Sequence, residues 1–252
     1  MPYRVDLREV ATNALDRLVE LGAIDAEIAH DGAIAALMPD SVPPDAVAAA
    51  LGTADVAVSP AVGRDDGSVW VLSLRPIRVG RYVLRLHDAA AFGTGLHPTT
   101  ALCLEAIEET AITAMPGALL DVGTGSGVLA LAALAIGVPR AMGIDIDENA
   151  LRVAAENARL NALDERLQLV LGGPEAVNGT WPFVVANVLA APLIEMAPVL
   201  VRRIGHHGQL VLSGIPSSVE PEVDAAYRRL GMQRVRVTSR AGWIALVMQA
   251  SW

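Results

Sequence analysis

The sequence predicts an α/β protein in which a Rossmann-like domain with a seven-stranded sheet follows a small α+β domain of the ferredoxin-like type. Three observations lead to this prediction. A glycine-rich turn joins an apolar strand to an Ala-rich helix near the middle of the chain. Short apolar runs then alternate with amphipathic segments up to the C-terminus, as in doubly wound sheets. The first 60 residues instead show a β-α-β-β-α-β order of patterns.

Residues 1–60 are expected to form the small domain. Gly22 and Gly52 each follow a helical stripe of apolar residues and end it. The predicted strands are 3–7, 25–29, 33–38 and 55–58, with a hairpin turn at 30–32, and the predicted helices are 9–21 and 45–51. Residues 61–90 are expected to be a linker with connecting strands at 68–74 and 82–86, which leaves residues 91–252 for the larger domain.

A polar loop opens the larger domain. Residues 91–100 (AFGTGLHPTT) contain two glycines, three threonines and a histidine just before a predicted helix. Thr99 or Thr100 can cap that helix, but capping does not explain the whole loop. Because loops commonly carry binding residues, Phe92 and Thr94 are candidate contacts to a cofactor.

The motif that organises this domain lies between a predicted strand at 118–120 and a predicted helix at 128–136. Asp121 ends the strand, and the turn that follows is rich in glycine. Its glycines have G-x-G-x-G spacing, at Gly123, Gly125 and Gly127. A second strand, at 141–144, follows the helix, so the segment is a βαβ unit of the kind that holds nucleotides.

The glycine spacing and two acidic residues favour S-adenosylmethionine as the cofactor. Dinucleotide folds use G-x-G-x-x-G and place a pyrophosphate at the helix N-terminus. Asp121 would repel that anion, but it suits the amino group and sulfonium of S-adenosylmethionine. Asp145 ends the next strand, where a carboxylate can accept both ribose hydroxyls. Two alternatives stay open for this stretch alone, a nicotinamide cofactor and glycines that only form a tight turn.

The remaining segments continue the alternation of strands and helices. Asn187 follows a predicted strand, at the same sheet edge as Gly123 and Asp145. Ligands lie outside this edge in open α/β sheets, so Asn187 is a candidate site residue, and capping of the next helix is its alternative role. The predicted helices are 101–110, 148–161, 192–203 and 221–230, and the predicted strands are 167–171, 182–186, 208–213 and an antiparallel pair at 233–239 and 243–248.

Composition limits the classes of function. The 252 residues carry a net charge of −9, which argues against a nucleic acid partner. Residues 1–60 hold ten acidic and three basic residues, which fits either attraction of a basic partner or a solvated surface. One cysteine, no apolar leader and no apolar run of about 20 residues indicate a cytoplasmic protein that does not enter a membrane. Apart from the adjacent His206 and His207, the five histidines are spread along the sequence, and the acidic residues do not cluster with them, so no metal site is expected. All 19 basic residues are arginine, which fits either a GC-rich genome or a lysine-modifying enzyme that spares itself.

Five motifs carry a family resemblance in this order: AFGTGLHPTTALCLEAIEE, LLDVGTGSGVLALAAL, GIDIDENAL, FVVANVLAAPLIEMAPVL and GWIALV. Together they resemble the ribosomal protein L11 methyltransferase family over about residues 91–248. The FGTG-x-HPTT loop and the ANVLA segment are the specific part of this resemblance. The chain departs from the commoner pattern at Leu96, which replaces a polar residue, and at Val188 and Ala191, where Ile and Gly are frequent.

The resemblance implies a class I methyltransferase domain at 91–252 and a substrate-recognition domain at 1–60. It also implies transfer of methyl groups from S-adenosylmethionine to lysine side chains or the N-terminal α-amine of a basic ribosomal protein. A monomer that requires no nucleic acid is expected. The cofactor contacts carried over from the family are Thr100, Gly123, Asp145 and Asn187, and the glycine turn adds Gly125, Gly127 and Asp121.

The chemistry of the reaction suggests two catalytic candidates. A sulfonium methyl group is already activated, so the enzyme mainly positions a neutral amine. We expect the Asn187 side-chain oxygen and a nearby backbone carbonyl to accept hydrogen bonds from that amine. His97 could relay a proton, although organising the loop is its favoured role. Two other classes of enzyme stay open, a methyltransferase of small molecules and a nicotinamide enzyme.

Overall fold

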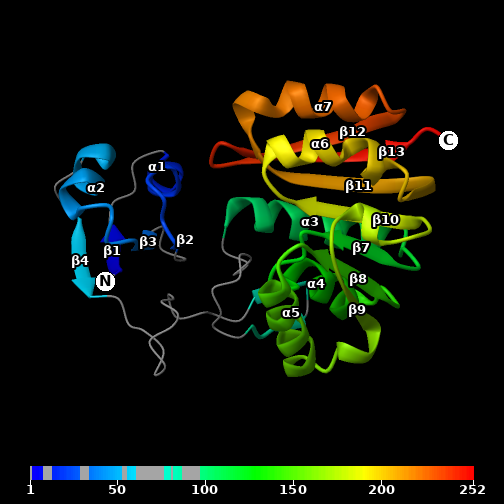
Figure 1. The fold of residues 1–252 in the computed structure, drawn as a ribbon, viewed down its shortest axis with the longest axis horizontal. Coiled ribbons are helices and arrows are strands. Elements are labelled where there is room, and N and C mark those ends of the chain that lie inside the picture. The colour runs from blue at the N-terminus through cyan, green and yellow to red at the C-terminus, as the bar shows by residue number, and fades with distance from the viewer. Residues whose placement is uncertain are drawn as a thin grey trace. The chain divides into compact units, whose positions relative to one another are not determined.

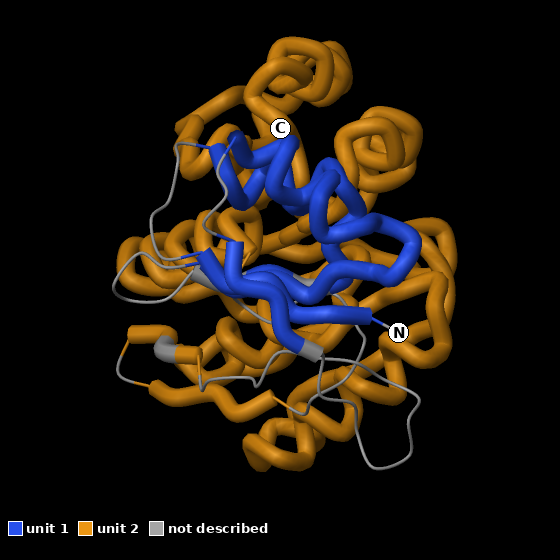
Figure 2. Tube along the Cα trace, turned by 90° about the vertical axis from the view of Figure 1, so that its left-hand side faces the viewer, with its two compact units in different colours: residues 1–74, 88–90 blue, residues 75–87, 91–252 orange. Residues whose placement is uncertain are grey.

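The computed structural model describes residues 2–7, 13–28, 34–52, 56–60, 77–80, 82–86 and 97–252. The chain divides into two compact units, residues 1–74 with 88–90 and residues 75–87 with 91–252 (Figure 2). Each unit has its own apolar core. The predicted turn at 30–32, the predicted strand at 68–74, and Phe92 and Thr94 lie outside the described residues.

The N-terminal unit is a sheet with the strand order β2-β3-β1-β4, and every neighbouring pair is antiparallel. This arrangement with two connecting helices is the ferredoxin-like fold, so that prediction is confirmed. Val5, Leu18 and Val47 bring β1 and both helices into one core. The elements are β1 (Tyr3–Leu7), α1 (Ala14–Glu20), β2 (Asp25–Ile28), β3 (Ile34–Met38), α2 (Pro44–Leu51) and β4 (Ala57–Pro60).

Three short elements differ from the prediction. The helix predicted over 9–21 begins only at Ala14, because Asn13 has a φ of 77°, a left-handed conformation that does not continue a helix. The strand predicted over 55–58 lies at Ala57–Pro60, where it pairs with β1. In the second unit, β5 (Ile77–Val79) pairs with β6 (Tyr82–Leu84), and β5 was missed because a strand of three residues is too short to show a period.

The second unit contains the predicted seven-stranded sheet, in the order β12-β13-β11-β10-β7-β8-β9 (Figure 1). Neighbours are parallel except for the two pairs that include β13, which confirms the late antiparallel pair. Its elements are α3 (Pro98–Thr113), β7 (Leu119–Val122), α4 (Val128–Ile136), β8 (Ala141–Asp145), α5 (Glu148–Leu160), η1 (Asp164–Arg166), β9 (Leu167–Leu171), η2 (Pro174–Ala176), β10 (Trp181–Asn187), α6 (Ala190–Val201), β11 (Ile204–Pro216), η3 (Ser217–Val219), α7 (Glu220–Arg228), β12 (Met232–Arg240) and β13 (Trp243–Ala250).

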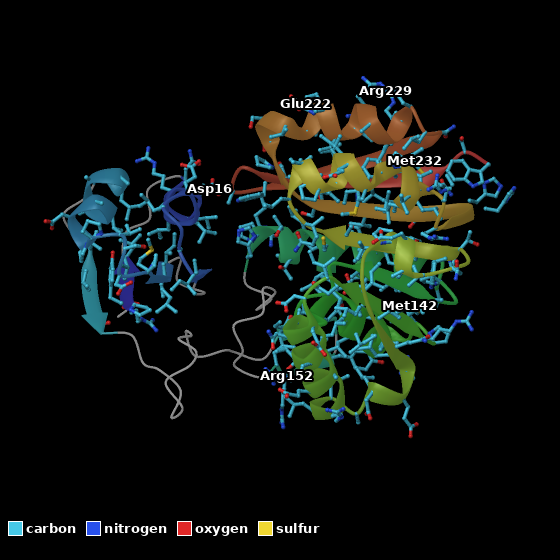
Figure 3. The ribbon with its side chains drawn as sticks, viewed as in Figure 1. Asp16, Met142, Arg152, Glu222, Arg229 and Met232 are labelled. Atoms are coloured by element: carbon cyan, nitrogen blue, oxygen red, sulfur yellow. The ribbon has the colours of Figure 1, made fainter. Side chains whose placement is uncertain are left out.

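Helices cover both faces of this sheet. Leu119 of β7 packs with residues of α3 and α4 in one core cluster, and its neighbour Leu120 packs with residues of α6 and α7 in the other. Successive residues of a strand therefore enter different cores, as expected for a mostly parallel sheet. The exposed Glu222 and Arg229 lie on the outer side of α7, away from the sheet (Figure 3).

The order in which successive strands join the sheet reverses at β7. β8 and β9 lie on one side of β7, and β10 and β11 lie on the other. Open α/β sheets bind ligands at such a switch point, at the carboxyl ends of the strands. Asp145 ends β8 and Asn187 ends β10, so both lie at this edge with the turn that follows β7.

Candidate functional site

The turn between β7 and α4 holds its three glycines in left-handed conformations. Gly123, Gly125 and Gly127 have φ values of 70°, 55° and 81°, which strain any residue with a Cβ. The N–H groups of Gly123 and Thr124 donate to Ile144 O over 2.9 and 3.0 Å, which fastens the turn to β8. The turn is therefore tight, and a ligand that approaches its three glycines would meet backbone there.

Asp145 connects the end of β8 to the glycine turn. Its Oδ2 accepts from Gly125 N over 2.9 Å, and its Oδ1 accepts from Asp147 N over 3.0 Å. The residue is half-buried, and a carboxylate can accept about four hydrogen bonds. Asp145 therefore keeps acceptor capacity for two ligand hydroxyls while it fixes the turn.

Asp121 is a buried carboxyl directly under the same turn. Its Oδ2 accepts from Thr124 Oγ1 over 2.7 Å and from Ala130 N over 3.2 Å. Its Oδ1 is buried and has no hydrogen-bond partner among the described residues. Burial raises the pKa of Asp121 from 3.8 to about 7, and the hydrogen bonds from Thr124 and Ala130 only partly oppose this shift. A cationic group beside Oδ1 would favour the ionised carboxylate.

Asp121→Asn keeps the shape of this side chain and removes its charge. The raised pKa means that the folded protein keeps a proton which the unfolded protein has lost, so the free energy of unfolding falls as pH rises from about 4 to about 7 and stays lowered above that. We therefore expect the variant to melt at a higher temperature than the wild type at pH 8. Its free energy of unfolding should be higher by up to roughly 4 kcal/mol. Melting temperatures of both proteins between pH 5 and 8 measure this.

Comparison of the two proteins at the same pH separates the effect of Asp121 from that of His97, which both proteins retain. The lowered pKa of His97 makes the free energy of unfolding rise with pH below about pH 6.5, the opposite of the effect of Asp121. The same variant should bind S-adenosylmethionine more weakly, because the ligand's cationic end loses its carboxylate. A variant that is no more stable than the wild type at pH 8, with unchanged affinity, would show that burial does not raise the pKa of Asp121 and that its carboxylate faces no ligand.

Asn187 and Thr100 meet at this edge, although 87 residues separate them in sequence. Asn187 Nδ2 donates to Thr100 Oγ1 over 3.4 Å, and both residues are buried. The Asn187 Oδ1 atom is buried without a hydrogen-bond partner among the described residues. Asn187 does not cap α6, which begins after Leu189 and has no side-chain cap. An acceptor oxygen is thus left available beside the glycine turn.

His97 is the N-cap of α3, a role that the sequence assigned to Thr99 or Thr100. Its Nδ1 accepts from Thr99 N over 3.3 Å and lies 2.8 Å from Thr99 Oγ1. Its ring lies edge-on to Trp243, with centroids 5.2 Å apart. Burial lowers the pKa of His97 to about 4, so the imidazole is neutral at pH 7. Because His97 caps the helix, the hydroxyl of Thr100 is left to meet Asn187.

Gly214 and Val188 are residues of this edge that sequence analysis missed as site residues. Gly214 has a φ of 83°, and a Cβ there would lie 2.2 Å from Val188 O. The available signal was a glycine directly after a predicted strand at the same edge. Close packing with Val188 could not be read from that signal, since it depends on the register between β10 and β11.

Three further observations concern a metal site, a membrane-spanning helix and the single cysteine. Within the described ranges, no three His, Cys, Asp or Glu side chains are grouped as a metal site would need. No described helix is long and apolar enough to cross a membrane. Cys103 is buried in α3, and burial raises the pKa of its thiol, so it is a core residue rather than a nucleophile.

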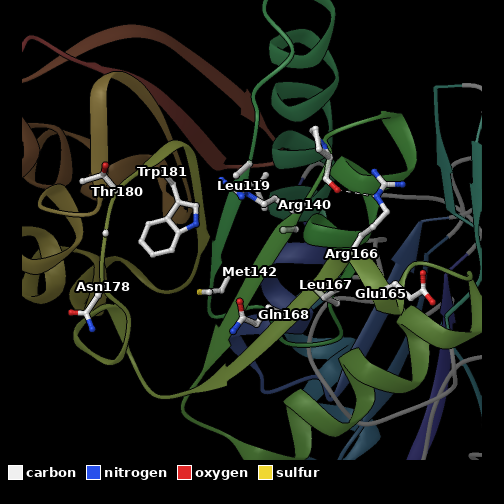
Figure 4. A pocket seen from close by; sticks show the side chains of 14 residues that line it. Leu119, Arg140, Met142, Glu165, Arg166, Leu167, Gln168, Asn178, Thr180 and Trp181 are labelled. Carbon is white, nitrogen blue, oxygen red and sulfur yellow. Dashed lines mark hydrogen bonds between the residues drawn. The ribbon is translucent and has the colours of Figure 1, made fainter.

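A hollow of about 480 Å³ lies at the opposite edge of the sheet, near the amino ends of the strands (Figure 4). Arg140, Arg166, Gln168 and Trp181 are among its lining residues. Arg166 is already engaged, since it donates to the carbonyls of Leu134, Val138 and Pro139. None of the sequence-predicted site residues lines this hollow, so we place the candidate site at the carboxyl edge.

Comparison with known proteins identifies relatives of this chain. A profile described as "Ribosomal protein L11 methyltransferase (PrmA)" matches residues 70–251. Curated proteins named ribosomal protein L11 methyltransferase are similar to this chain. The protein of Pelobacter propionicus is 40% identical over an alignment of 212 residues, and the match covers 75% of this chain and 68% of the relative. That of Sorangium cellulosum is 40% identical over an alignment of 194 residues, and the match covers 69% of this chain and 61% of the relative.

Solved structures give the same picture. The ribosomal protein L11 methylase of Lactobacillus delbrueckii subsp. bulgaricus has a TM-score of 0.64 and 31% identity, and the match covers 71% of this chain and 90% of that one. The putative methyltransferase yhhF of Escherichia coli has a TM-score of 0.55 at 18% identity, a likeness of fold alone. The matches to the two curated relatives span 68% and 61% of the relatives' own length.

Proposed function

Because the chain belongs to the ribosomal protein L11 methyltransferase family, we propose that it transfers methyl groups from S-adenosylmethionine to amines of ribosomal protein L11. The acceptors in this proposal are lysine side chains, the N-terminal α-amine, or both. The proposal includes a monomeric, cytoplasmic enzyme that needs no nucleic acid for the reaction.

One observation carries the proposal: a buried amide oxygen, Asn187 Oδ1, has no partner among the described residues at the ligand-binding edge. Buried polar atoms in folded proteins are nearly always hydrogen-bonded. An unpaired acceptor next to the glycine turn is therefore suited to a donor that arrives with the substrate. The N–H group of an amine is such a donor.

The residues at this edge fit S-adenosylmethionine. The turn with Gly123, Gly125 and Gly127 would bring backbone close to the ligand, and Asp145 would accept from the ribose hydroxyls. Asp121 would face the cationic end through its unpaired Oδ1. Thr100, Phe92 and Thr94 complete the proposed contacts. When bound, the cofactor supplies an electrophilic methyl group, so the chain need not provide a nucleophile of its own.

The chain's task is to hold the acceptor amine in its neutral form. A lysine ammonium has a pKa of about 10.4 in water and must lose a proton before its lone pair can react. A buried edge disfavours the charged form, and Asn187 Oδ1 can accept one N–H of the neutral amine while leaving the lone pair free. Thr100 Oγ1 accepts from Asn187 Nδ2, which fixes the amide so that its oxygen faces the amine.

His97 serves this site by organising α3, in our proposal. His97→Asn retains a good N-cap but cannot relay a proton, so we expect turnover within about threefold of the wild type. His97→Ala removes the cap and should lower stability by about 1 kcal/mol. Methylation rates and melting temperatures of both variants measure this. Equal and large losses of turnover in both variants would instead support a proton relay.

The N-terminal unit is the proposed substrate-recognition domain, over residues 1–60. Its excess of acidic residues would attract a basic ribosomal protein, and its fold is separate from the unit that holds the glycine turn. In this proposal the connection between the two lies within residues 61–90, of which β5 and β6 belong to the second unit. The attraction should weaken as salt rises, because exposed charges are screened over about 10 Å at 0.1 M.

Calorimetry with the purified protein distinguishes the classes of enzyme. Binding of S-adenosylmethionine but not of NAD is expected, and binding of NAD alone would contradict the proposal and support a nicotinamide enzyme. Free lysine and small amines should be poor acceptors beside ribosomal protein. A strong preference for free amines would keep the cofactor and replace the substrate with a small molecule.

A further inference from the structure

Val188, the residue after Asn187, is enclosed by two glycines from the neighbouring strands. A Cβ on Gly123, after β7, would come within 2.4 Å of Val188 Cγ1. A Cβ on Gly214, in β11, would lie 2.2 Å from Val188 O, 2.6 Å from Val188 C and 3.1 Å from Val188 N. Distances below 3.0 Å do not occur for real Cβ atoms. The first glycine therefore borders the side chain of Val188, and the second borders its peptide groups.

A β-bulge places Gly214 against residue 188. In the pairing of β11 with β13, Leu212 faces Leu246 and Ile215 faces Ile244, so two residues of β11 oppose one of β13. The extra residue lets the backbone turn, and Gly214 takes a φ of 83° there. Bulges of this kind bend a strand and occur near active sites, where they re-aim neighbouring groups.

The bulge is anchored on both sides. Ser213 pairs with Asn187 in the parallel register of β10 and β11. Ser213 Oγ donates to Ile244 O over 2.9 Å, which fastens the bulge to β13. The peptide groups around Val188 thus pack against a fixed piece of backbone. Any displacement of Gly214 would shift the Val188 carbonyl and the adjoining Asn187 side chain.

We propose that Gly214 is a positioning residue for the acceptor amine: its bulge holds the Val188 peptide, and thereby the Asn187 amide, in the place that the reaction requires. This inference rests on the proposed function. Misplacement of reacting groups by about 1 Å can cost about 100-fold in rate, so a small shift at Val188 is enough to matter. The Val188 carbonyl is then the backbone acceptor next to Asn187, and Gly214 sets where it lies.

The two glycines give variants with opposite behaviour. Gly123→Ala collides with a side chain, so the additional change Val188→Ala relieves the collision. Gly214→Ala collides with backbone, and no change of the Val188 side chain can relieve it. Gly179 supplies a matched control, since it also has a left-handed φ, of 90°, but has nothing within 4 Å of its Cβ position. Gly179→Ala carries the backbone strain without the collision.

The test compares these variants in methylation kinetics, cofactor calorimetry and thermal melting. We expect Gly214→Ala to lower kcat about 30-fold or more, with KM for the protein substrate and Kd for S-adenosylmethionine within about threefold of the wild type. Gly179→Ala should keep kcat, and Gly214→Ala with Val188→Ala should remain slow. Gly123→Ala should weaken cofactor binding, and Val188→Ala should restore it in part.

A second variant covers the case in which Gly214→Ala does not fold. Ser213→Ala loosens the bulge without a collision, and it should lower kcat several-fold while KM and the Kd for S-adenosylmethionine stay near the wild-type values.

The inference would be overturned by a kcat of Gly214→Ala equal to that of Gly179→Ala, or by a parallel loss of cofactor affinity and turnover in Gly214→Ala. Recovery of Gly214→Ala by Val188→Ala would do so as well. Failure of the proposed function gives a different pattern. The wild type would then methylate no ribosomal protein, while melting temperatures would still show coupling of Val188→Ala with Gly123→Ala and none with Gly214→Ala.

Discussion

Asn187→Ala should lower turnover about 100-fold or more while the affinity for S-adenosylmethionine changes by less than about threefold. The variant removes the unpaired acceptor Oδ1 at the end of β10, so the amine loses the group that aims its lone pair. The glycine turn and Asp145 are untouched, so the cofactor's proposed contacts remain. Single-turnover methylation and calorimetry on the same preparation measure the two quantities separately.

Asn157 is a matched control for this variant. It is also a buried asparagine, but its Nδ2 donates to Ser126 O, within the glycine turn, over 2.8 Å. Asn157→Ala should therefore weaken cofactor binding and stability without a specific loss in the rate of methyl transfer at saturating cofactor. Asn187→Ala with normal turnover, or with a loss of affinity as large as that of Asn157→Ala, would refute the positioning role of Asn187.

Asp145→Ala should weaken binding of S-adenosylmethionine about 100-fold. The side chain accepts from Gly125 N and Asp147 N, and it would accept from the ribose hydroxyls as well. Two hydrogen bonds to a charged group contribute roughly 1.5 kcal/mol each or more, which together correspond to that change in Kd. Turnover at saturating cofactor should fall much less. Calorimetric titration of the purified variant measures Kd directly.

Asp147 offers the control, because it is an exposed acid on the same loop. Its Oδ1 accepts from Asn149 N over 2.9 Å and caps α5. Asp147→Ala should cost about 1 kcal/mol of stability and leave the Kd nearly unchanged. Equal Kd values for Asp145→Ala and the wild type would remove Asp145 from the cofactor site, since both variants lose local backbone contacts and only Asp145→Ala loses the ribose acceptor.

The parts of the fold that local chemistry specifies could be predicted from the sequence. Helix α4 has the predicted bounds at both ends because Gly127 and Gly137 each take a backbone conformation that ends a helix. Asn187 and Asp145 could be found because strand ends at one sheet edge converge. The alternation of apolar runs with amphipathic segments predicted the order of strands and helices along the second unit.

The parts that depend on contacts between distant segments could not be predicted. His97 caps α3 instead of Thr99, a choice set by its burial against Trp243, far along the chain. Gly214 touches Val188 only because β11 bulges beside β10. The unpaired oxygens of Asp121 and Asn187 are likewise tertiary features, since any sequence shows the residue but not its missing partner.

Because this chain contains no lysine, the enzyme cannot contribute methyl-lysine to a methylation assay. All 19 basic residues are arginine, so no lysine of the enzyme itself can accept a methyl group. Label that appears on lysine must therefore belong to another protein. Digestion of the labelled material to amino acids separates methyl-lysine from amino acids methylated at the N-terminal α-amine. The α-amine is the one kind of acceptor that both the enzyme and its substrate carry.

The most direct measurement is the transfer of radiolabelled methyl groups from S-adenosylmethionine to total ribosomal proteins from cells that lack this enzyme. We predict one labelled band, at the mass of ribosomal protein L11, with the label in methylated amines, and no such band with Asn187→Ala. Label on a different protein, or no protein label from an enzyme that binds the cofactor, would contradict the proposed substrate.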